Sequence, residues 1–378
     1  MASAMTTKER LLAAITGRDV DYAPMVLHFW ASPRHPRAVW SSEAERLAFY
    51  RERGWDTYVL TAAGVSPLPE VTTQTAFEMS NGQRVFQQTW HTPARDLSER
   101  LRVTDDWLQA LPPRHPLLDD FRTSRYLEYP FKTTADLAAL PYLFPRRNRV
   151  DEAAIAAAHA EARALADEFA VPLVGYCPDG LDWLLWLFPA QEAVLRAALE
   201  PDFIRALLAP INAAHQQRLG FLLDLGVEAV LRRGWYESTD FWSPALYAEF
   251  AKPPLLAEVA ATHEAGVPFV YQMDSGIMPL LEQLASVPFD CLLGADPVTS
   301  QQDSHTIRER LPGKALWGGL SGPLQLGRGT PADTEAAVER AFAACGNRGF
   351  ILGPGVGLRH DWPWANIEAC DRAWRRLR

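Results

Sequence analysis

The second half of the chain alternates short, continuous apolar runs with longer segments of helical periodicity, and this pattern restricts the fold more than any other feature. Six apolar runs each precede a helical segment, at 171–177, 227–235, 267–274, 289–296, 315–321 and 349–355. Apolar strands separated by single helices are typical of a parallel sheet with right-handed crossovers. Two more runs, at 23–30 and 56–61, bring the total to eight. We therefore predict an α/β fold, a (β/α)8 TIM barrel.

A bare barrel takes about 250 residues, so more than a hundred of the 378 residues must lie elsewhere. Most of them fall between about 65 and 170. Here "TTQTAFEMSNGQRVFQQTW" carries Asn-Gly between two β-prone runs, which predicts a β-hairpin. Proline-bearing segments and an Ala-rich helix at 151–170 follow. No Gly/Ser-rich linker isolates this region, so we expect one domain, 1–378, with an inserted β-hairpin and helical segment at about 65–170.

The composition, with 48% hydrophobic and 22% charged residues, is ordinary for a globular enzyme. A formal charge of -9 disfavours a nucleic-acid partner. No apolar stretch approaches the ~20 residues of a membrane helix, and the N-terminal apolar run is too short for a signal peptide. The four cysteines lie far apart without a Cys-x-x-Cys pair, which favours reduced thiols. We expect a cytoplasmic protein with no membrane or nucleic-acid partner.

Barrel enzymes place their active site at the C-terminal ends of the strands, so the polar residues just beyond each apolar run are the candidates. They are His28, Trp30, Arg34 and His35 after the first run, Tyr176 after the third, Trp235, Glu237 and Asp240 after the fourth, Gln272 and Asp274 after the fifth, and His360 after the last. Asp56 stands at the start of the second run, with Tyr58 within it. Such a ring could bind a polar or anionic small molecule and supply acid–base groups.

Structural roles compete with these assignments. An Asp after a strand more often caps a helix than catalyses, and Asp296 before Pro297 fits a cap or turn. His28 and Trp30 could simply pack. The segment "RHPR" at 34–37 could be a solvated loop, although two arginines that flank a histidine also suit carboxylate binding.

Acidic residues stand in two settings that suit a general acid. The segment "GWYESTDFWSP" holds Glu237 and Asp240 among aromatic residues, which would raise the pKa of a carboxyl group by excluding water. The run 267–274 ends in Gln272-Met273-Asp274, followed by Ser-Gly, which lets the backbone approach a ligand closely.

Five segments together resemble the uroporphyrinogen decarboxylase superfamily. They are "TTKERLLAAITGRDVDYAPMVLHFW", "GWDTYVL", "EYPFKTTADLAAL", "WSPALYAEFAKPPLLAEVAATHEAGVPFVYQMDSG" and "RGFILGPGVGLRHDWPWANIEAC". The superfamily contains porphyrinogen decarboxylases and barrel methyltransferases that work with corrinoid proteins. The resemblance runs from about residue 6 to 376 and is nearer the methyltransferase and demethylase branch.

The resemblance also shows which metal ligands this chain lacks. In the coenzyme M methyltransferase branch, His-x-Cys at the end of the fifth strand and a cysteine in the last glycine-rich turn hold zinc. The matching positions here are Gln272, Asp274 and Val356, and an amide and an aliphatic chain cannot replace imidazole and thiolate. We therefore expect no zinc and no tightly bound cofactor. The aryl-ether demethylating branch uses varied ligands that include carboxylates, so a site from Glu237, Asp274 and His360 stays open.

The decarboxylases proper differ from this chain at two motifs. Their Arg-Gln-Ala-Gly-Arg loop after the first strand is replaced by "ASPRHPR", and their Gly-His-Gly near the C-terminus by Gly353-Pro354-Gly355. Asp56 falls roughly in the region of their essential aspartate. Similar stretches occur across the superfamily, however, and Asp56 could only brace the barrel.

Three functions stay open. The favoured one is a methyltransferase or demethylase that moves a methyl group from a small methylated substrate to a corrinoid on a small partner protein, with Glu237 or Asp274 as general acid. The second is a cofactor-free decarboxylase of a porphyrinogen-like or other carboxylated substrate, with Asp56 stabilising a protonated ring and Arg34 or Arg37 binding carboxylates. The third is a non-catalytic tetrapyrrole-binding barrel. The substrate stays open, as does the oligomeric state, for which a homodimer is one option.

Overall fold

Seven parallel strands form one sheet in the order β1–β6–β7–β8–β9–β10–β11. The computed structural model describes residues 5–29, 35–104, 117, 122–177, 180–299 and 301–378. The strands are β1 Val59–Ala62, β6 Leu173–Cys177, β7 Ala229–Arg233, β8 Phe269–Gln272, β9 Cys291–Ala295, β10 Ala315–Leu320 and β11 Phe350–Pro354. Six of them lie within the six apolar runs that the sequence places after residue 170, which confirms those strands.

The segment around Met25 closes this sheet into the predicted (β/α)8 TIM barrel. Met25 forms a parallel bridge with Leu352 of β11, and Val26 forms one with Asp56, just before β1. The N–H of Val26 donates to the Leu352 carbonyl at 2.9 Å, and the N–H of Asp56 donates to the Met25 carbonyl at 3.1 Å. The eighth position is therefore held by short bridges instead of the full strand expected from the sequence. Pro24 offers only its carbonyl to β11, because it has no N–H.

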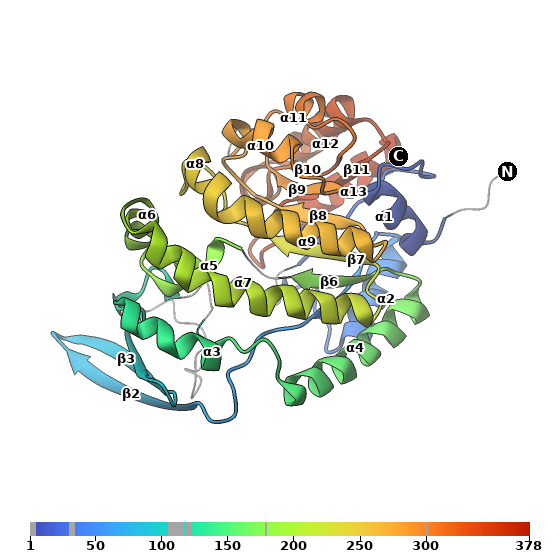
Figure 1. The fold of residues 1–378 in the computed structure, drawn as a ribbon. Helices are drawn as coiled ribbons and strands as arrows, with labels where there is room; N and C mark the ends of the chain where they lie inside the picture. Colours follow the sequence, from blue (N-terminus) through green and yellow to red (C-terminus); the bar gives the residue numbers. More distant parts are fainter. Residues whose placement is uncertain (1–4, 30–34, 105–116, 118–121, 178–179, 300) are drawn as a thin grey trace.

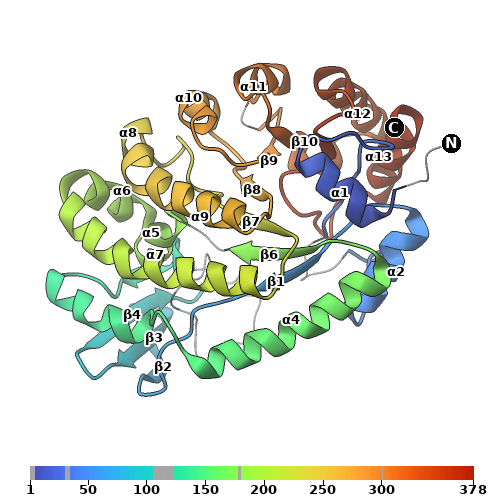
Figure 2. The same ribbon diagram turned by 45° about the vertical axis from the view of Figure 1, so that its right-hand side comes forward.

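Helices surround the barrel, as Figures 1 and 2 show. The α-helices are α1 Thr7–Ile15, α2 Glu43–Arg53, α3 Leu140–Leu143, α4 Arg149–Phe169, α5 Asp182–Leu187, α6 Ala190–Leu199, α7 Pro201–Asp224, α8 Pro244–Leu246, α9 Lys252–Glu264, α10 Leu281–Ala285, α11 Ser304–Arg310, α12 Pro331–Cys345 and α13 Trp364–Leu377. Short 3-10 turns (η2 Thr134–Ala139, η4 Met278–Leu280) and π turns (η3 Tyr247–Ala251, η5 Gly322–Gly327) join them. Among the described residues, no helix is long and apolar enough to cross a membrane.

Two of these helices have a defined place on the barrel. α4, the Ala-rich helix, packs against α2 and β1 and leads into β6. It is therefore the crossover between β1 and β6. α1 packs Leu11 and Ile15 against Ala229 and Ala315, which begin β7 and β10. α1 therefore covers the N-terminal end of the barrel and leaves the C-terminal ends of the strands as the open mouth.

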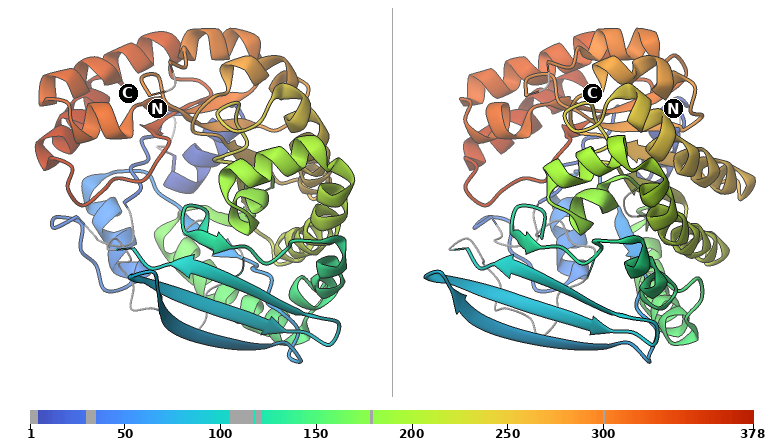
Figure 3. Two further views of the ribbon diagram at one scale, coloured as in Figure 1. Left: turned by 90° about the vertical axis from the view of Figure 1, so that its left-hand side faces the viewer. Right: turned by 60° about the vertical axis from the view of Figure 1, so that its left-hand side comes forward.

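The inserted region contains a second, antiparallel sheet with the strand order β2–β3–β4–β5. Its strands are β2 Thr72–Ser80, β3 Gln83–His91, β4 Asp96–Arg102 and β5 Tyr126–Glu128. Asn81 and Gly82 connect β2 to β3 with φ values of 51° and 76°, which confirms the predicted hairpin. Figure 3 shows this sheet beside the barrel. Trp90 and Leu97 pack into the main core and fix one face of the sheet to the body of the protein.

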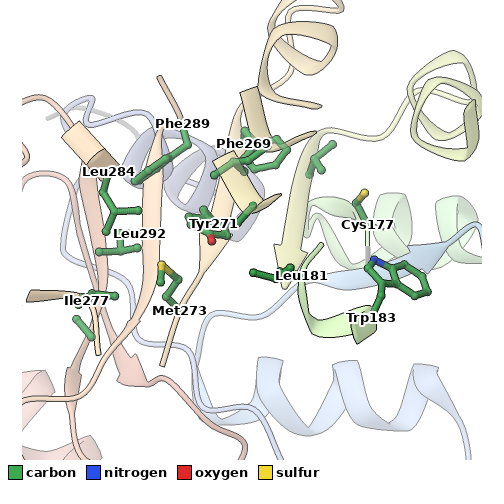
Figure 4. Close-up of a cluster of buried hydrophobic side chains, with 14 of the residues drawn as sticks. Cys177, Leu181, Trp183, Phe269, Tyr271, Met273, Ile277, Leu284, Phe289 and Leu292 are labelled. Carbon is green, nitrogen blue, oxygen red and sulfur yellow. The ribbon is translucent and has the colours of Figure 1, made fainter. Parts of the chain in front are cut away.

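Side chains alternate along the barrel strands between the barrel interior and the surrounding helices. On β8, Val270 belongs to the interior cluster, whereas Phe269 and Tyr271 belong to the outer core. Figure 4 shows these two aromatic residues with Phe289 and Leu292 in that outer core. The same alternation decides which polar residue at each strand end reaches the mouth.

Candidate functional site

A cavity of about 190 Å³ lies at the mouth of the barrel. Its wall follows the alternation rule, because each strand contributes every second residue. The lining residues are Val26, His28, Tyr58, Leu60, Tyr176, Leu231, Arg233, Trp235, Gln272, Leu293, Trp317 and the turn 354–357. Of the residues predicted to bind substrate, the structure therefore brings together His28, Tyr176, Trp235 and Gln272.

Aromatic rings form much of this wall. The His28 and Tyr58 rings lie nearly parallel, at 9° and 6.4 Å between centroids, and Tyr58 meets Trp317 edge-on at 5.7 Å. The Arg233 guanidinium lies 4.3 Å from the centre of the Trp235 ring. Stacking on an aromatic ring holds a guanidinium in a fixed position. The cavity thus offers flat apolar surfaces and a positive charge at one side.

His28 faces the cavity and is neutral at physiological pH. It is exposed to the space in the mouth. Loss of hydration, helped by the nearby Arg46 charge, lowers the pKa of His28 to about 4. The backbone carbonyl of His28 accepts a hydrogen bond from the N–H of Leu358 at 2.6 Å, which ties the segment after Val26 to the turn beyond β11. His28 can therefore donate or accept a hydrogen bond without carrying charge.

Gln272 and Asp274 connect the end of β8 to the last glycine-rich turn. The amide nitrogen of Gln272 donates to the Gly355 carbonyl at 2.9 Å and lies 3.4 Å from Oδ1 of Asp274. Burial raises the pKa of Asp274 well above its usual range, and this effect outweighs the hydrogen bond from Gln272 and the positive charge of Arg233. The negative charge of Asp296 raises it further. Asp274 is partly exposed and lies next to two residues of the cavity wall, Gln272 and Gly355.

Two glycines make room for the Asp274 carboxyl. A Cβ atom on Gly294 would lie 2.5 Å from its Oδ1, and one on Gly355 would lie 3.0 Å from the same atom. Gly294 also has a φ of 115°, which side-chain-bearing residues rarely adopt. The fold therefore has glycine, which has no side chain, at the two positions next to the Asp274 carboxyl, one on β9 and one after β11.

Asp296 has the structural role predicted for it. Its Oδ1 accepts hydrogen bonds from the N–H groups of Val298 and Thr299, both at 2.8 Å. These bonds confirm a capping turn after β9. Asp274 and Asp296 follow neighbouring strands, but only Asp296 has its carboxylate occupied by backbone donors.

Glu237 lies in a fully buried network outside the cavity. Its carboxylate accepts hydrogen bonds from Arg232 at 2.5 and 3.0 Å, from the Tyr271 hydroxyl at 2.5 Å and from the Leu181 N–H at 2.6 Å. Arg232 also pairs with Glu258 at 2.6 Å. These contacts join the segments after β6 and β7 to β8, and they favour a structural role. The predicted catalytic role of Glu237 stays a prediction.

Asp56 lies at the N-terminal side of β1, whereas the cavity lies at the C-terminal ends of the strands. Its carboxylate pairs with Arg10 of α1 at 2.7 Å and accepts from the Met25 N–H at 3.3 Å. Asp56 thus joins the helix that covers the barrel to the segment that closes it. This placement favours the bracing role that the sequence left open.

The other predicted residues lie apart from the cavity wall. His35 is buried, and its Nδ1 accepts from the Arg37 N–H at 3.0 Å, so its Nε2 carries the proton toward the Trp362 carbonyl at 3.1 Å. Asp240 and His360 are exposed on the surface. Arg37 is exposed and lies 3.7 Å from Glu368. Trp30 and Arg34 lie outside the described residues.

Arg233 and Trp317 are lining residues that the sequence analysis missed. Both lie within strands, so a search restricted to the residues beyond each apolar run passes over them. The signal that would have found them is the alternation of side-chain direction at every second residue of a strand. Once Leu231 is taken to face the interior, Arg233 must face it as well, and Arg232 must face the helices.

No group of three or more His, Cys, Asp or Glu side chains that could hold a metal ion occurs in the described part of the chain. Gln272 hydrogen-bonds to a backbone carbonyl, and Val356 is an apolar part of the cavity wall. These residues do not fit the zinc site of the coenzyme M branch. The expectation that the chain binds no zinc stays a prediction.

Solved structures and a family model are similar to this chain. A methyltransferase from Methanosarcina mazei has a similar fold, with a TM-score of 0.65 and 17% identity over 98% of this chain and 99% of that one. A B12-independent methionine synthase from Shewanella sp. W3-18-1, in complex with selenomethionine, gives a TM-score of 0.43 and 10% identity over 94% of each chain. No curated protein matches. The family model for uroporphyrinogen decarboxylase (URO-D) matches residues 126–377, which is more than half of the chain, so the chain belongs to the URO-D family.

Proposed function

We propose that this protein is a methyltransferase that takes a methyl group from a small aromatic methyl ether or amine and passes it to a corrinoid on a partner protein. The observation that carries the proposal is the small, aromatic-walled cavity with the Asp274 carboxyl, whose pKa burial raises, 3.4 Å from the amide nitrogen of the lining residue Gln272. Flat aromatic walls such as Tyr58 and Trp317 stack on a flat aromatic substrate. This chemistry needs a proton donor, and a raised pKa suits Asp274 to that role.

The proposed step balances with one proton. The methyl carbon moves to the acceptor, the bond from that carbon to the substrate oxygen or nitrogen breaks, and the departing atom takes a proton. Asp274 is the proposed donor, either directly or through one water molecule. Gln272 holds the end of β8 against Gly355 and so sets where the Asp274 carboxyl lies.

The size of the cavity is the reason to place the corrinoid on a separate protein. Pockets for drug-sized ligands measure about 300–1,000 Å³, and this cavity of about 190 Å³ is smaller. A corrinoid ring is larger than a drug-sized ligand, so it would have to approach the mouth from outside. The same comparison weighs against a porphyrinogen substrate and against a tetrapyrrole-binding barrel.

A second candidate is decarboxylation of a small aromatic acid in the same cavity. Arg233 favours it, because a stacked guanidinium in the wall can bind a carboxylate. In this reaction Asp274 would protonate the ring carbon as carbon dioxide leaves. The two candidates therefore share their residues and differ in their product.

The test compares both products in one experiment. Purified protein is incubated without oxygen with reduced free cobalamin and a panel of methoxylated and methylaminated benzenes and benzoates. We expect methylated cobalamin in the visible spectrum and the matching demethylated product by mass spectrometry. Asp274→Asn should reduce both by about 10²-fold or more, and Asp296→Asn should not. Carbon dioxide release from the benzoates without methyl transfer would favour decarboxylation, and equal rates in Asp274→Asn would remove Asp274 from the reaction.

A further inference from the structure

β2 forms an outer edge of the inserted sheet, and its free side has no hydrogen-bond partner in the described part of the chain. All nine residues of β2 pair with β3, without a shift of register. In Figures 1 and 3, β2 lies on the outside of the molecule with no helix along its free side. Its outward N–H and C=O groups are therefore open to another strand.

This edge lacks the features that usually protect an edge strand. Edge strands are usually kept from pairing with strands of other molecules by short length, bulges, prolines or charges, especially lysines. β2 is nine residues long and contains neither proline nor lysine. Its only charge is Glu78, which Arg100 neutralises at 2.5 Å. Phe77 and Met79 are 43% and 70% exposed, so apolar side chains accompany the open backbone.

The hairpin turn fixes which residues direct their backbone groups outward. In a two-residue loop with positive φ at Asn81 and Gly82, the flanking residues Ser80 and Gln83 form a hydrogen-bonded pair. Hydrogen-bonded and non-hydrogen-bonded pairs then alternate along the ladder. The outward-directed residues of β2 are consequently Thr73, Thr75, Phe77 and Met79.

We propose that two copies of the chain pair through β2 in antiparallel orientation, about a two-fold axis at Ala76, to form one continuous eight-stranded sheet. In this register every residue that directs its backbone groups outward lies opposite another such residue of the partner strand. Thr75 lies opposite the partner's Phe77, a β-branched and aromatic pair of the kind that stabilises sheets. Gln74 lies opposite the partner's Glu78, so no like charges meet, and the small Ala76 faces its own copy on the axis.

The surface is thus complementary to itself, which is what a two-fold dimer requires. An unrelated edge strand would match its backbone but would not reproduce this order of side chains. The proposal does not depend on the reaction assigned to the barrel, because none of the described residues of the inserted sheet lines the cavity.

The test uses the charge of residue 76 in the full-length chain. Ala76 is exposed on the outer face of the sheet, so Ala76→Lys and Ala76→Glu leave the core untouched. Each variant places two like charges opposite each other on the axis and should weaken dimerisation by about tenfold or more. An equimolar mixture of the two variants places lysine opposite glutamate and should restore the dimer. Ser98→Lys, on the same exposed face but in β4, is the matched control and should dimerise as the wild type does.

Analytical ultracentrifugation from nanomolar to high micromolar concentration measures these states, and circular dichroism confirms that each variant is folded. A wild-type protein that stays monomeric overturns the proposal. So does a dimer that survives both charged variants, or one that Ser98→Lys weakens as much. If each variant is monomeric and their mixture fails to dimerise, the register about Ala76 is wrong and the proposal fails in this form.

Discussion

Glu237→Gln should destabilise the fold by about 3–5 kcal/mol, although it preserves the shape of the side chain. One carboxylate oxygen accepts from Leu181 and Arg232, and the other accepts from Tyr271 and Arg232. Glutamine has one oxygen, so its NH2 group must face one of these donor pairs. Arg232 would then keep only Glu258 as a carboxylate partner.

The magnitude follows from what is lost. Burial alone would lower the pKa of Arg232, but the charges of Glu237 and Glu258 outweigh burial and raise it well above its usual range. The guanidinium is therefore buried as a cation that two carboxylates balance. A hydrogen bond to a charged group contributes about 1.5–3 kcal/mol, and the exchange removes two bonds to the carboxylate. Leaving a buried charge partly unpaired gives a cost of the same size.

Urea unfolding followed by tryptophan fluorescence measures this cost, and two variants calibrate it. Tyr271→Phe removes one neutral donor and should cost about 1–2 kcal/mol. Asp240→Asn changes an exposed acid three residues from Glu237, whose carboxylate lies 3.5 Å from the Ser238 hydroxyl, and should stay within about 0.5 kcal/mol. A loss below about 1 kcal/mol for Glu237→Gln, or a loss in Asp240→Asn as large as that in Glu237→Gln, would refute the structural reading of this network.

Four further predictions concern the cavity. Asp274→Asn should reduce turnover by about 10²-fold or more with little change in melting temperature, whereas Asp296→Asn should be mild because asparagine caps about as well. The raised pKa of Asp274 means that the folded state binds its proton more tightly than the unfolded state, so wild-type stability should fall as pH rises from 3.8 through that pKa, and Asp274→Asn should lose less in urea titrations. The pH dependence expected from His28 is opposite, because its pKa falls from 6.5 to about 4 on folding. Stability should therefore drop as pH falls between these values. Melting curves at several pH values should show a smaller drop for His28→Gln. Because Gln272 and Val356 replace zinc ligands, elemental analysis should find far less than one zinc per chain, and stoichiometric zinc that survives a chelator wash would contradict this.

The barrel could be predicted from the sequence because its strands are buried on both faces and so read as continuous apolar runs. The hairpin could be predicted because Asn81-Gly82 suits only a few turns. The closing segment could not be bounded, since it leaves the sheet after Val26 although its apolar run continues. The strand predicted at 56–61 begins earlier than the observed strand, which starts at Val59. Asp56 instead forms the ion pair with Arg10.

The candidate site was predicted less well because a list of residues beyond each strand ignores the direction of the side chains. Arg232 and Arg233 are adjacent and chemically identical, yet one is buried with two carboxylates and the other lines the cavity. Only the alternation along β7 separates them. Partners distant in the sequence matter equally, since nothing near Asp56 in the chain indicates that Arg10 neutralises it.

The three acids predicted to be catalytic therefore differ in what the fold does to their charge. Asp56 and Glu237 each form an ion pair with a buried arginine, and protonating either one would remove a charge that balances that arginine. Asp274 has no ion pair in the described part of the chain, and burial raises its pKa. Burial raises the pKa of Asp56 as well, but there the charge of Arg10 opposes the effect. A general acid must hold a proton at working pH and release it when the leaving atom needs it. Among the three, Asp274 combines a raised pKa with no paired arginine, and its carboxyl lies next to two residues of the cavity wall, Gln272 and Gly355.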